Sequence, residues 1–348
     1  MVPGSIRFLS LALAAAQLGA AVPQAVTEAA RGTALAKEGK YDLAIQRYKA
    51  ALRLDSHLPG LYLNLGLAYF KSKRLAEAAT AFEEAVRADS GSFQARALLG
   101  MSYYGCARYA DAAAQLKLAS AEQPDNLELR YRLAQSYLSA GQNAEAQAEF
   151  QVLAAKNPDS APVHVLLGEA LDASNQAERA TAEFEAAVKL PPVPANAHFG
   201  LGYIYWKQRR YEEAGREFEA ELASQPQYAQ ALTYLGDAEL HTGRDKQAEG
   251  HLRSALALDG SIRLAQLDLG ILLAAKNDSE GAARHFREAI RIDPSKPDAH
   301  YRLGRLWRSS GREQEAQAEF EKVKKLAAEQ PQPPLLQIPG QVPWRPQP

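Results

Sequence analysis

The sequence of 348 residues predicts an all-α, right-handed superhelical solenoid of nine helix-turn-helix repeats, each 34 residues long. Three observations lead to this prediction. A small residue, nearly always glycine, recurs every 34 residues; alanine recurs in a second column; and a large side chain follows that alanine by four positions. Self-similarity at a fixed period of about 20 to 50 residues indicates stacked repeats. We therefore expect one continuous array rather than separate domains.

Residues 1–21 differ from the rest of the chain and are expected to be a secretory signal peptide. Arg7 precedes the apolar run FLSLALAAAQLGAA, which closes on small residues before Val22. This order is typical of signal peptides, and the run is too short for a full transmembrane helix. We therefore expect export to the periplasm or the extracellular space. The alternatives are a cytoplasmic protein whose N-terminus is disordered or forms an extra capping helix, and an uncleaved segment that tethers the chain to a membrane.

The first repeating column consists of small residues and runs through the chain without insertion or deletion. Its members are Gly32, Gly66, Gly100, Ala134, Gly168, Gly202, Gly236, Gly270 and Gly304. Leucine precedes the small residue in eight of the nine repeats, and Arg31 is the exception. A glycine inside a helix costs about 1 kcal/mol relative to alanine. The column therefore predicts a close approach between the two helices of each repeat, which glycine permits.

The second column consists of alanine in all nine repeats, from Ala44 to Ala316. Four positions later stand Tyr48, Phe82, Leu116, Phe150, Phe184, Phe218, Leu252, Phe286 and Phe320. Small and large residues one helical turn apart share a helix face and predict interlocking packing.

Each repeat is expected to hold two helices joined by a short polar turn such as KSKR or SAGQ. The second helices are expected to stop at Pro124, Pro158, Pro192, Pro226 and Pro294. The solenoid spans residues 25–330, with repeats at 25–58, 59–92, 93–126, 127–160, 161–194, 195–228, 229–262, 263–296 and 297–330.

These columns resemble the tetratricopeptide repeat (TPR) family over residues 25–330. The leucine-glycine pair, the alanine, the phenylalanine, the closing proline and a tyrosine at positions such as Tyr69 and Tyr103 all match the family pattern. Three departures are local, and one of them is the degenerate first repeat. Glu239 replaces the tyrosine and Glu221 occupies a column of alanines, so we expect looser packing at both places.

The resemblance implies a non-catalytic interaction scaffold whose concave wall is formed by the first helix of each repeat. The partner is expected to be a protein, bound through a peptide segment or a helix, because aromatic side chains in a groove suit such recognition. The matching columns assign to this wall Leu63, Asn64, Leu67, Phe70, Met101, Tyr104, Tyr131, Arg132, Gln135, Phe199, Tyr203, Trp206, Tyr234 and Asp237. The alternative is that neighbouring repeats bury part of the wall.

Other features of the sequence favour no catalytic or metal chemistry. Glu169 and Asp172 lie one helical turn apart, but no phosphate loop, nucleophile motif or metal-ligand spacing accompanies them. His164, His198 and His300 share one structural column, which favours packing. We expect no enzyme activity, no cofactor and no metal. The formal net charge of −1 gives no reason to expect nucleic acid as a partner.

Two further features are left with open interpretations. Arg302, Arg305 and Arg308 follow one another every three residues and are expected either to bind a carboxylate on a partner or to form a solvated face. Residues 331–348 form a proline-rich tail, with disorder, recognition by proline-binding domains and capping of the last repeat as alternatives. Besides the scaffold, a membrane-tethered assembly factor and an accessory subunit of a separately encoded enzyme remain alternative functions.

Overall fold

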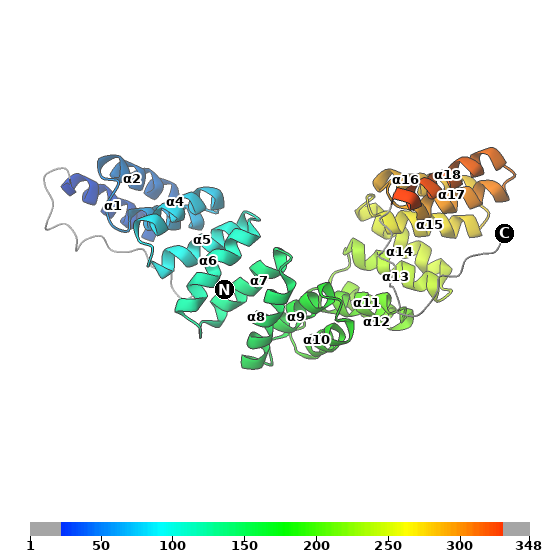
Figure 1. Cartoon of the computed structure of the whole chain (residues 1–348), viewed down its shortest axis with the longest axis horizontal. Coiled ribbons are helices and arrows are strands. Elements are labelled where there is room, and N and C mark those ends of the chain that lie inside the picture. The colour runs from blue at the N-terminus through cyan, green and yellow to red at the C-terminus, as the bar shows by residue number, and fades with distance from the viewer. Residues whose placement is uncertain (1–21, 330–348) are drawn as a thin grey trace, which may run out of the picture. The chain divides into compact units, whose positions relative to one another are not determined.

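A computed structural model describes residues 22–329, so the predicted signal peptide and proline-rich tail lie outside the described residues. Within 22–329 the chain forms eighteen helices and no strand, which confirms the all-α prediction (Figure 1). The helices form nine hairpins. They divide into two compact units, whose described parts are residues 22–194 (unit 1) and 195–329 (unit 2).

Unit 1 contains five hairpins. Its helices are α1 (Val22–Lys37), α2 (Tyr41–Leu54), α3 (Leu61–Lys71), α4 (Leu75–Ala88), α5 (Phe93–Gly105), α6 (Tyr109–Glu122), α7 (Leu127–Ser139), α8 (Asn143–Lys156), α9 (Ala161–Ala173) and α10 (Ala177–Lys189). The two helices of each hairpin pack together, and each second helix also packs on the first helix of the next hairpin in this unit.

Unit 2 contains four hairpins arranged in the same way. Its helices are α11 (Ala197–Lys207), α12 (Tyr211–Ser224), α13 (Ala229–His241), α14 (Asp245–Leu258), α15 (Arg263–Ala275), α16 (Ser279–Ile292), α17 (Pro297–Ser309) and α18 (Glu313–Glu329). In addition, the first helices touch one another, because α13 contacts both α11 and α15, and α15 contacts α17. These contacts place α11, α13, α15 and α17 side by side along one wall of unit 2.

The column of large side chains forms the centre of each hairpin. The first eight members, from Tyr48 to Phe286, are buried at 2% exposure or less. Phe320, in the last hairpin, is only partly buried. The second helices that precede the five column prolines end two or three residues before them, as expected from the missing amide hydrogen of proline.

A third column, in the turn between the two helices of every hairpin, has positive φ. Its members are Gly39, Lys73, Ala107, Gly141, Asn175, Arg209, Gly243, Asn277 and Gly311. In the second hairpin, the amide of Lys73 bonds to the carbonyl of Phe70 and the amide of Arg74 bonds to that of Tyr69. This is the Schellman arrangement that ends a helix with a left-handed residue. Hence each turn is set by backbone hydrogen bonds even where a glycine is missing.

Candidate functional site

Four aromatic side chains on α11 and α13 form a partly exposed cluster in unit 2. Phe199 stacks on Tyr203 at a centroid distance of 6.3 Å and an interplanar angle of 12°, and Tyr203 stacks on Trp206 at 5.9 Å and 15°. Tyr234 meets Tyr203 and Trp206 edge-on, at 5.3 Å and 5.0 Å. The four residues come from separate turns of two helices, yet each ring touches at least two others. Such contacts fix the ring orientations.

Two further rings of the same unit, the buried Phe218 and the partly exposed Tyr228, pack against this cluster. Phe218 on α12 is fully buried and lies 5.7 Å from Phe199 and 5.8 Å from Tyr234. Tyr228, just before α13, lies 4.9 Å from Phe199. Burial raises the pKa of Tyr234 to about 12, so its hydroxyl stays neutral. The rings of the cluster therefore form a surface with fixed geometry.

The start of α11, which carries Phe199, is capped by a side chain from α12. The Glu221 carboxylate accepts hydrogen bonds from the backbone amides of Asn196 and Phe199, both at 3.0 Å. Glu221 is only 1% exposed, and Gln225 also donates to it. The first amides of a helix have no partner within the helix, so this carboxylate satisfies two donors there. The expectation of loose packing around Glu221 is therefore wrong.

Below the cluster, Trp206 is tied to a buried acid pair. Its indole N–H donates to Oδ2 of Asp237 at 2.5 Å, and Asp237 is 5% exposed. Asp268, one repeat further on α15, is 3% exposed, and its Oδ2 has no hydrogen-bond partner. Burial raises the pKa of Asp268 well above its usual value, and the nearby charge of Asp237 raises it further. Burial thus favours the protonated form of the Asp268 carboxyl more strongly than water does.

The aromatic cluster forms one side of a groove of about 490 Å³. The groove is lined by Phe199, Tyr203, Gln230, Thr233, Tyr234, Asp259, Ser261, Ile262 and Leu264. Apolar rings thus face a rim that carries amide, hydroxyl and carboxylate groups. This composition suits a chain that buries a side chain and hydrogen-bonds through its polar groups.

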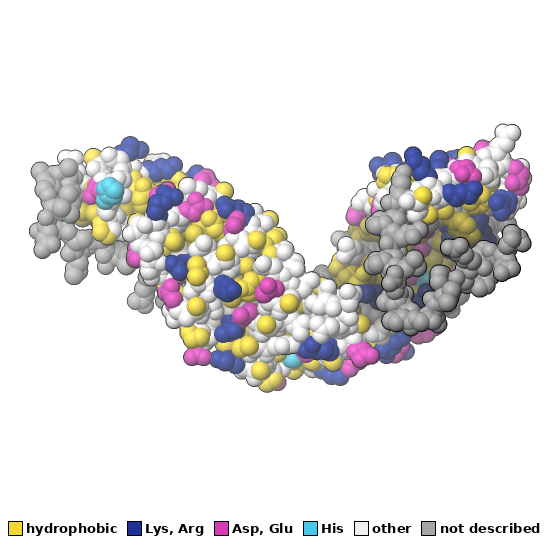
Figure 2. Space-filling view, in the orientation of Figure 1, with side chains coloured by type: hydrophobic (Ala, Val, Ile, Leu, Met, Phe, Trp, Pro, Cys, Tyr) yellow, Lys and Arg dark blue, Asp and Glu magenta, His cyan; other side chains and the backbone are white. Residues whose placement is uncertain are grey.

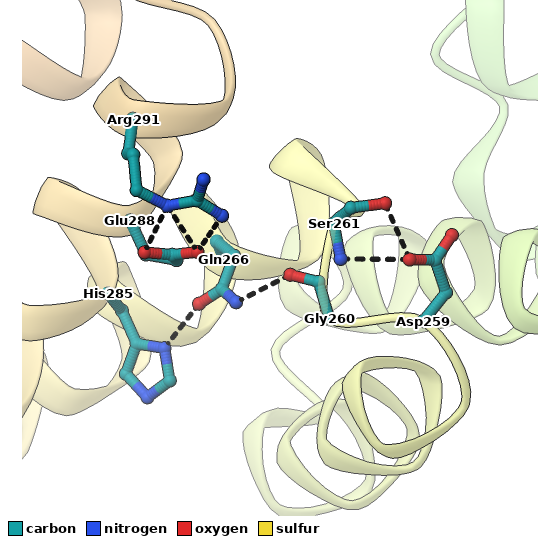
Figure 3. Close-up of polar contacts among 7 residues, drawn as sticks. All are labelled: Asp259, Gly260, Ser261, Gln266, His285, Glu288 and Arg291. Atoms are coloured by element: carbon teal, nitrogen blue, oxygen red, sulfur yellow. Dashed lines mark hydrogen bonds and ion pairs between the residues drawn. The ribbon is translucent and has the colours of Figure 1, made fainter.

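The far rim of the groove is a short loop held by side-chain hydrogen bonds (Figure 3). Asp259 Oδ1 accepts from the amide of Ser261 at 2.8 Å and from its hydroxyl at 2.6 Å, and these bonds lower the pKa of Asp259. Gln266 on α15 donates to the carbonyl of Gly260 at 3.1 Å and accepts from Nδ1 of His285 on α16 at 2.6 Å. The rim is therefore anchored to both helices of the next hairpin and carries a negative charge.

Models described as TPR repeat or tetratricopeptide repeat match this chain at 32–73, 59–92, 107–164, 165–227, 205–261 and 267–331. The chain is a tetratricopeptide repeat protein. Tetratricopeptide repeats are typical of protein interaction scaffolds without catalytic activity, and the groove agrees with that general role.

Solved structures share the fold of this TPR protein at low sequence identity. A tetratricopeptide repeat protein from Parabacteroides merdae is 16% identical with a TM-score of 0.55, covering 70% of this chain and 96% of its own. The Cut9-Hcn1 hetero-tetramer of APC/C is 12% identical with a TM-score of 0.56, and the match covers 90% of this chain and 76% of that chain. PilF of Pseudomonas aeruginosa is 18% identical with a TM-score of 0.52, and the match covers 59% of this chain and 93% of that chain. A comparison with curated proteins gave no match. These likenesses establish the fold alone.

The structure brings only some of the predicted wall residues together. Phe199, Tyr203, Trp206 and Tyr234 meet in unit 2, with Asp237 buried beneath them. The other residues of the groove lie on α13 (Gln230 and Thr233), in the loop at 259–262 and at the start of α15 (Leu264). No column of the repeat marks that loop, so the periodicity did not single it out.

In unit 1 of the TPR protein the predicted wall is partly covered by its own packing. Leu63, Asn64 and Leu67 are exposed by 5% or less, and both leucines belong to the hydrophobic core. The alternative that neighbouring repeats bury part of the wall therefore holds for these three residues, as it does for Asp237. Burial removes them from the surface that a partner can reach.

The remaining predicted residues of unit 1 are partly exposed and make local contacts. Phe70, Met101 and Tyr104 pack against the core, and Tyr104 meets Tyr109 edge-on at 5.2 Å. Tyr131 packs edge-on against the buried Phe150 at 6.3 Å. Arg132 donates to Gln135 at 3.3 Å. These contacts join neighbours within a hairpin or one repeat, and they form no cluster of mutually touching exposed rings among the described residues.

The titratable residues noted in the sequence have structural partners. Nδ1 of His164, His198 and His300 donates to a glutamate nineteen residues later, at 2.7, 2.7 and 2.5 Å. These hydrogen bonds link the first and second helices of their hairpins. The part of the chain that the structure describes holds no group of three His, Cys, Asp or Glu placed to bind a metal ion. Glu169 is exposed to solvent on one side, and the partial burial of its carboxyl raises the pKa of that group above its usual value.

None of the helices described between 22 and 329 has the length and apolar character that crossing a membrane requires.

Proposed function

We propose that this TPR protein is a non-catalytic scaffold that holds an extended peptide segment or a partner helix in the groove of unit 2. The observation that carries the proposal is the aromatic cluster of Phe199, Tyr203, Trp206 and Tyr234 beside a groove of about 490 Å³. Exposed aromatic rings offer a large contact area and lose little side-chain entropy on binding. Rings that already support one another lose even less.

The polar rim supplies the second part of recognition. Gln230 and Ser261 are exposed and carry an amide and a hydroxyl, and Asp259 adds a carboxylate. These groups suit the backbone N–H and C=O groups of an extended chain, whereas the rings suit one of its apolar side chains. The groove therefore fits a peptide-like ligand better than a wholly apolar one.

The test is to block the groove without removing any of its rings. Gln230→Arg places a long charged side chain at an exposed rim position, and Gln247→Arg makes the same change at an exposed position of α14 outside the groove. Each full-length variant is used to capture partners from the native cell, and the captured proteins are quantified by mass spectrometry. We expect Gln230→Arg to lose the partner that the parent chain and Gln247→Arg both retain. Equal capture by both variants would contradict the proposal.

We also propose that the protein is exported. The support for export is the order of residues 1–21, in which Arg7 precedes an apolar run that closes on small residues before Val22. N-terminal sequencing of the mature protein tests this proposal. A mature chain that starts near Val22 would support export, and one that starts at Met1 would contradict cleavage.

A further inference from the structure

The first helix of the last hairpin, α17, presents three exposed arginines at successive turns. Arg302, Arg305 and Arg308 are all exposed, and none forms an ion pair among residues 22–329. Arg312, in the same hairpin, pairs with both Glu315 and Glu280. Like charges one turn apart on a helix repel each other. Among residues 22–329, no carboxylate lies within ion-pair distance of this row of cations, and the nearest effect is that of Arg302 on the carboxyl of Asp268.

Two of these guanidinium groups are held in place by aromatic rings. Arg305 lies 6.0 Å from the ring centroid of Tyr301, and Arg308 lies 4.5 Å from that of Phe320. Contact with a ring face restricts a long side chain without using its N–H donors. Both groups thus keep their hydrogen-bond donors available for an anion. Figure 2 shows Lys and Arg side chains gathered over the C-terminal end of unit 2.

The arginines continue the same wall that carries the aromatic groove. Arg302 follows Asp268 by 34 positions and Tyr234 by 68, and the helices that carry them touch in the order α13, α15, α17. Arg302 is also near enough to Asp268 to oppose in part the effect of burial on the pKa of that carboxyl. Along this wall the surface therefore changes from aromatic rings at α11 and α13 to cationic groups at α17.

The separation between the two ends fits a short peptide. Packed helices lie about 8 to 10 Å apart, so α13 and α17 are separated by roughly 20 Å. An extended chain covers about 3.3 Å per residue, so some six residues join an anchor at the rings to a group at the arginines. Guanidinium groups prefer carboxylates, which they bind through paired hydrogen bonds.

We propose that the ligand of unit 2 is an acidic peptide segment, with an aromatic or large apolar residue in the groove and Asp or Glu residues about six positions away on Arg302, Arg305 and Arg308. This inference rests on the proposed function and specifies the partner of the same site. The ring cluster alone would accept an apolar side chain of any peptide. The arginines select among such peptides by charge.

The experiment is selection of random twelve-residue peptides, displayed on phage, against the intact protein. It is repeated with Arg302→Gln/Arg305→Gln/Arg308→Gln and with Arg53→Gln/Arg216→Gln/Arg284→Gln, a control that removes the same charge from exposed positions on other helices. We expect an excess of Asp and Glu about six positions from an aromatic residue with the parent and the control, and none with the first variant. The affinity of the selected peptides should fall at least tenfold in that variant and should weaken as salt rises.

The outcomes separate this inference from the proposed function. If the selected peptides lack acidic residues but lose binding to Gln230→Arg, the groove binds peptides and the acidic partner is wrong. If no selected peptide is sensitive to Gln230→Arg, or none is enriched, both proposals fail. If an oligonucleotide or vesicles of phosphatidylglycerol bind through the three arginines while peptides show no acidic excess, the partner belongs to a different class and the inference is overturned.

Discussion

Gly66 on α3 faces the ring of Phe82 on α4 so closely that a Cβ added to the glycine would lie 2.5 Å from Cε1 of the ring. The same relationship recurs through the array, for example between Gly270 and Phe286 at 2.6 Å. Because Phe82 is fully buried, its ring has little room to move away. The glycine column thus makes space for a large side chain of the second helix.

Gly66→Ala is expected to destabilise the protein in spite of the higher helix propensity of alanine. Forcing an extra carbon into a packed core costs about 1 to 3 kcal/mol, and the gain in propensity is at most about 1 kcal/mol. Gly250→Ala is the matched control, since Gly250 also lies inside a helix but has open space around it. Guanidinium unfolding followed by circular dichroism should give a lower midpoint for Gly66→Ala and an equal or higher one for Gly250→Ala. A stabilised Gly66→Ala would show that the contact is not tight.

The hairpins could be predicted from the sequence because their packing repeats every 34 residues, which makes Gly66, Phe82 and their equivalents visible as columns. The group that contacts the glycine could not be predicted. We expected the backbones of the two helices to approach each other there, whereas in the structure the ring of Phe82 lies against Gly66. The positive φ of Ala107 was also missed, because neither its side chain nor its neighbours resemble a glycine turn. Such a position is set by the backbone hydrogen bonds that end the helix.

The candidate site was predictable only where it follows the repeat. Phe199, Tyr203 and Tyr234 stand in wall columns, so their shared surface could be inferred. Ser261 and its loop belong to no column that carries a signal, and its position depends on hydrogen bonds made by Gln266. The burial of Asp237 was missed for another reason. Its position in the repeat predicts which way the side chain points, but it does not predict how closely neighbouring side chains pack around it.

Glu221→Ala is expected to destabilise unit 2 and to weaken binding in its groove. The substitution restores the alanine of the column but leaves the amides of Asn196 and Phe199 without their acceptor. A fully buried donor left unpaired costs about 1 to 3 kcal/mol, and these two part-buried amides should cost less because water can reach them. Glu221→Gln, which keeps one acceptor oxygen, should lose less. Thermal unfolding of the two variants tests the order, and equal midpoints for the parent and Glu221→Ala would show that the cap contributes nothing.

The pair of His251 and Glu239 is expected to make stability depend on pH. Nδ1 of His251 donates to the Glu239 carboxylate at 2.8 Å, and this hydrogen bond raises the pKa of His251, although partial burial opposes it. The protonated pair therefore stabilises the fold fully below the unfolded pKa of about 6.5, and this contribution is lost as pH rises through the higher folded value. The pair also fills the place where a tyrosine was expected, so looser packing at Glu239, which is 1% exposed, is not what the structure shows.

Thermal unfolding between pH 6 and pH 9 measures this contribution. The midpoint of the parent should fall as pH rises, and the fall should be smaller in His251→Gln, which cannot gain a proton but still donates to Glu239. His57→Gln changes an exposed histidine in unit 1 and should keep the slope of the parent. A His251→Gln slope identical to that of the parent would rule out the pair as a source of the pH dependence.

Asp268→Asn is expected to stabilise the protein at neutral pH. Burial raises the pKa of Asp268, so the folded state holds this proton more tightly than the unfolded chain does. Stability is therefore lost as pH rises from about 3.9, the unfolded value, through the folded value. Asparagine removes that loss. Unfolding midpoints at pH 7.5 should be higher for Asp268→Asn than for the parent and unchanged for the exposed Asp159→Asn, whereas a lower midpoint would mean that the charged form is favoured in the fold.

The measurement that tests the binding groove most directly is site-specific photocrosslinking. Benzoylphenylalanine is placed at position 230, on the rim of the groove, and separately at position 247 on α14, and each full-length protein is irradiated with an acidic peptide obtained by selection. The account predicts a crosslinked product from position 230 and none from position 247. Crosslinking from position 247 alone, or equally from both positions, would contradict the claim that the aromatic groove of unit 2 is where this protein holds its partner.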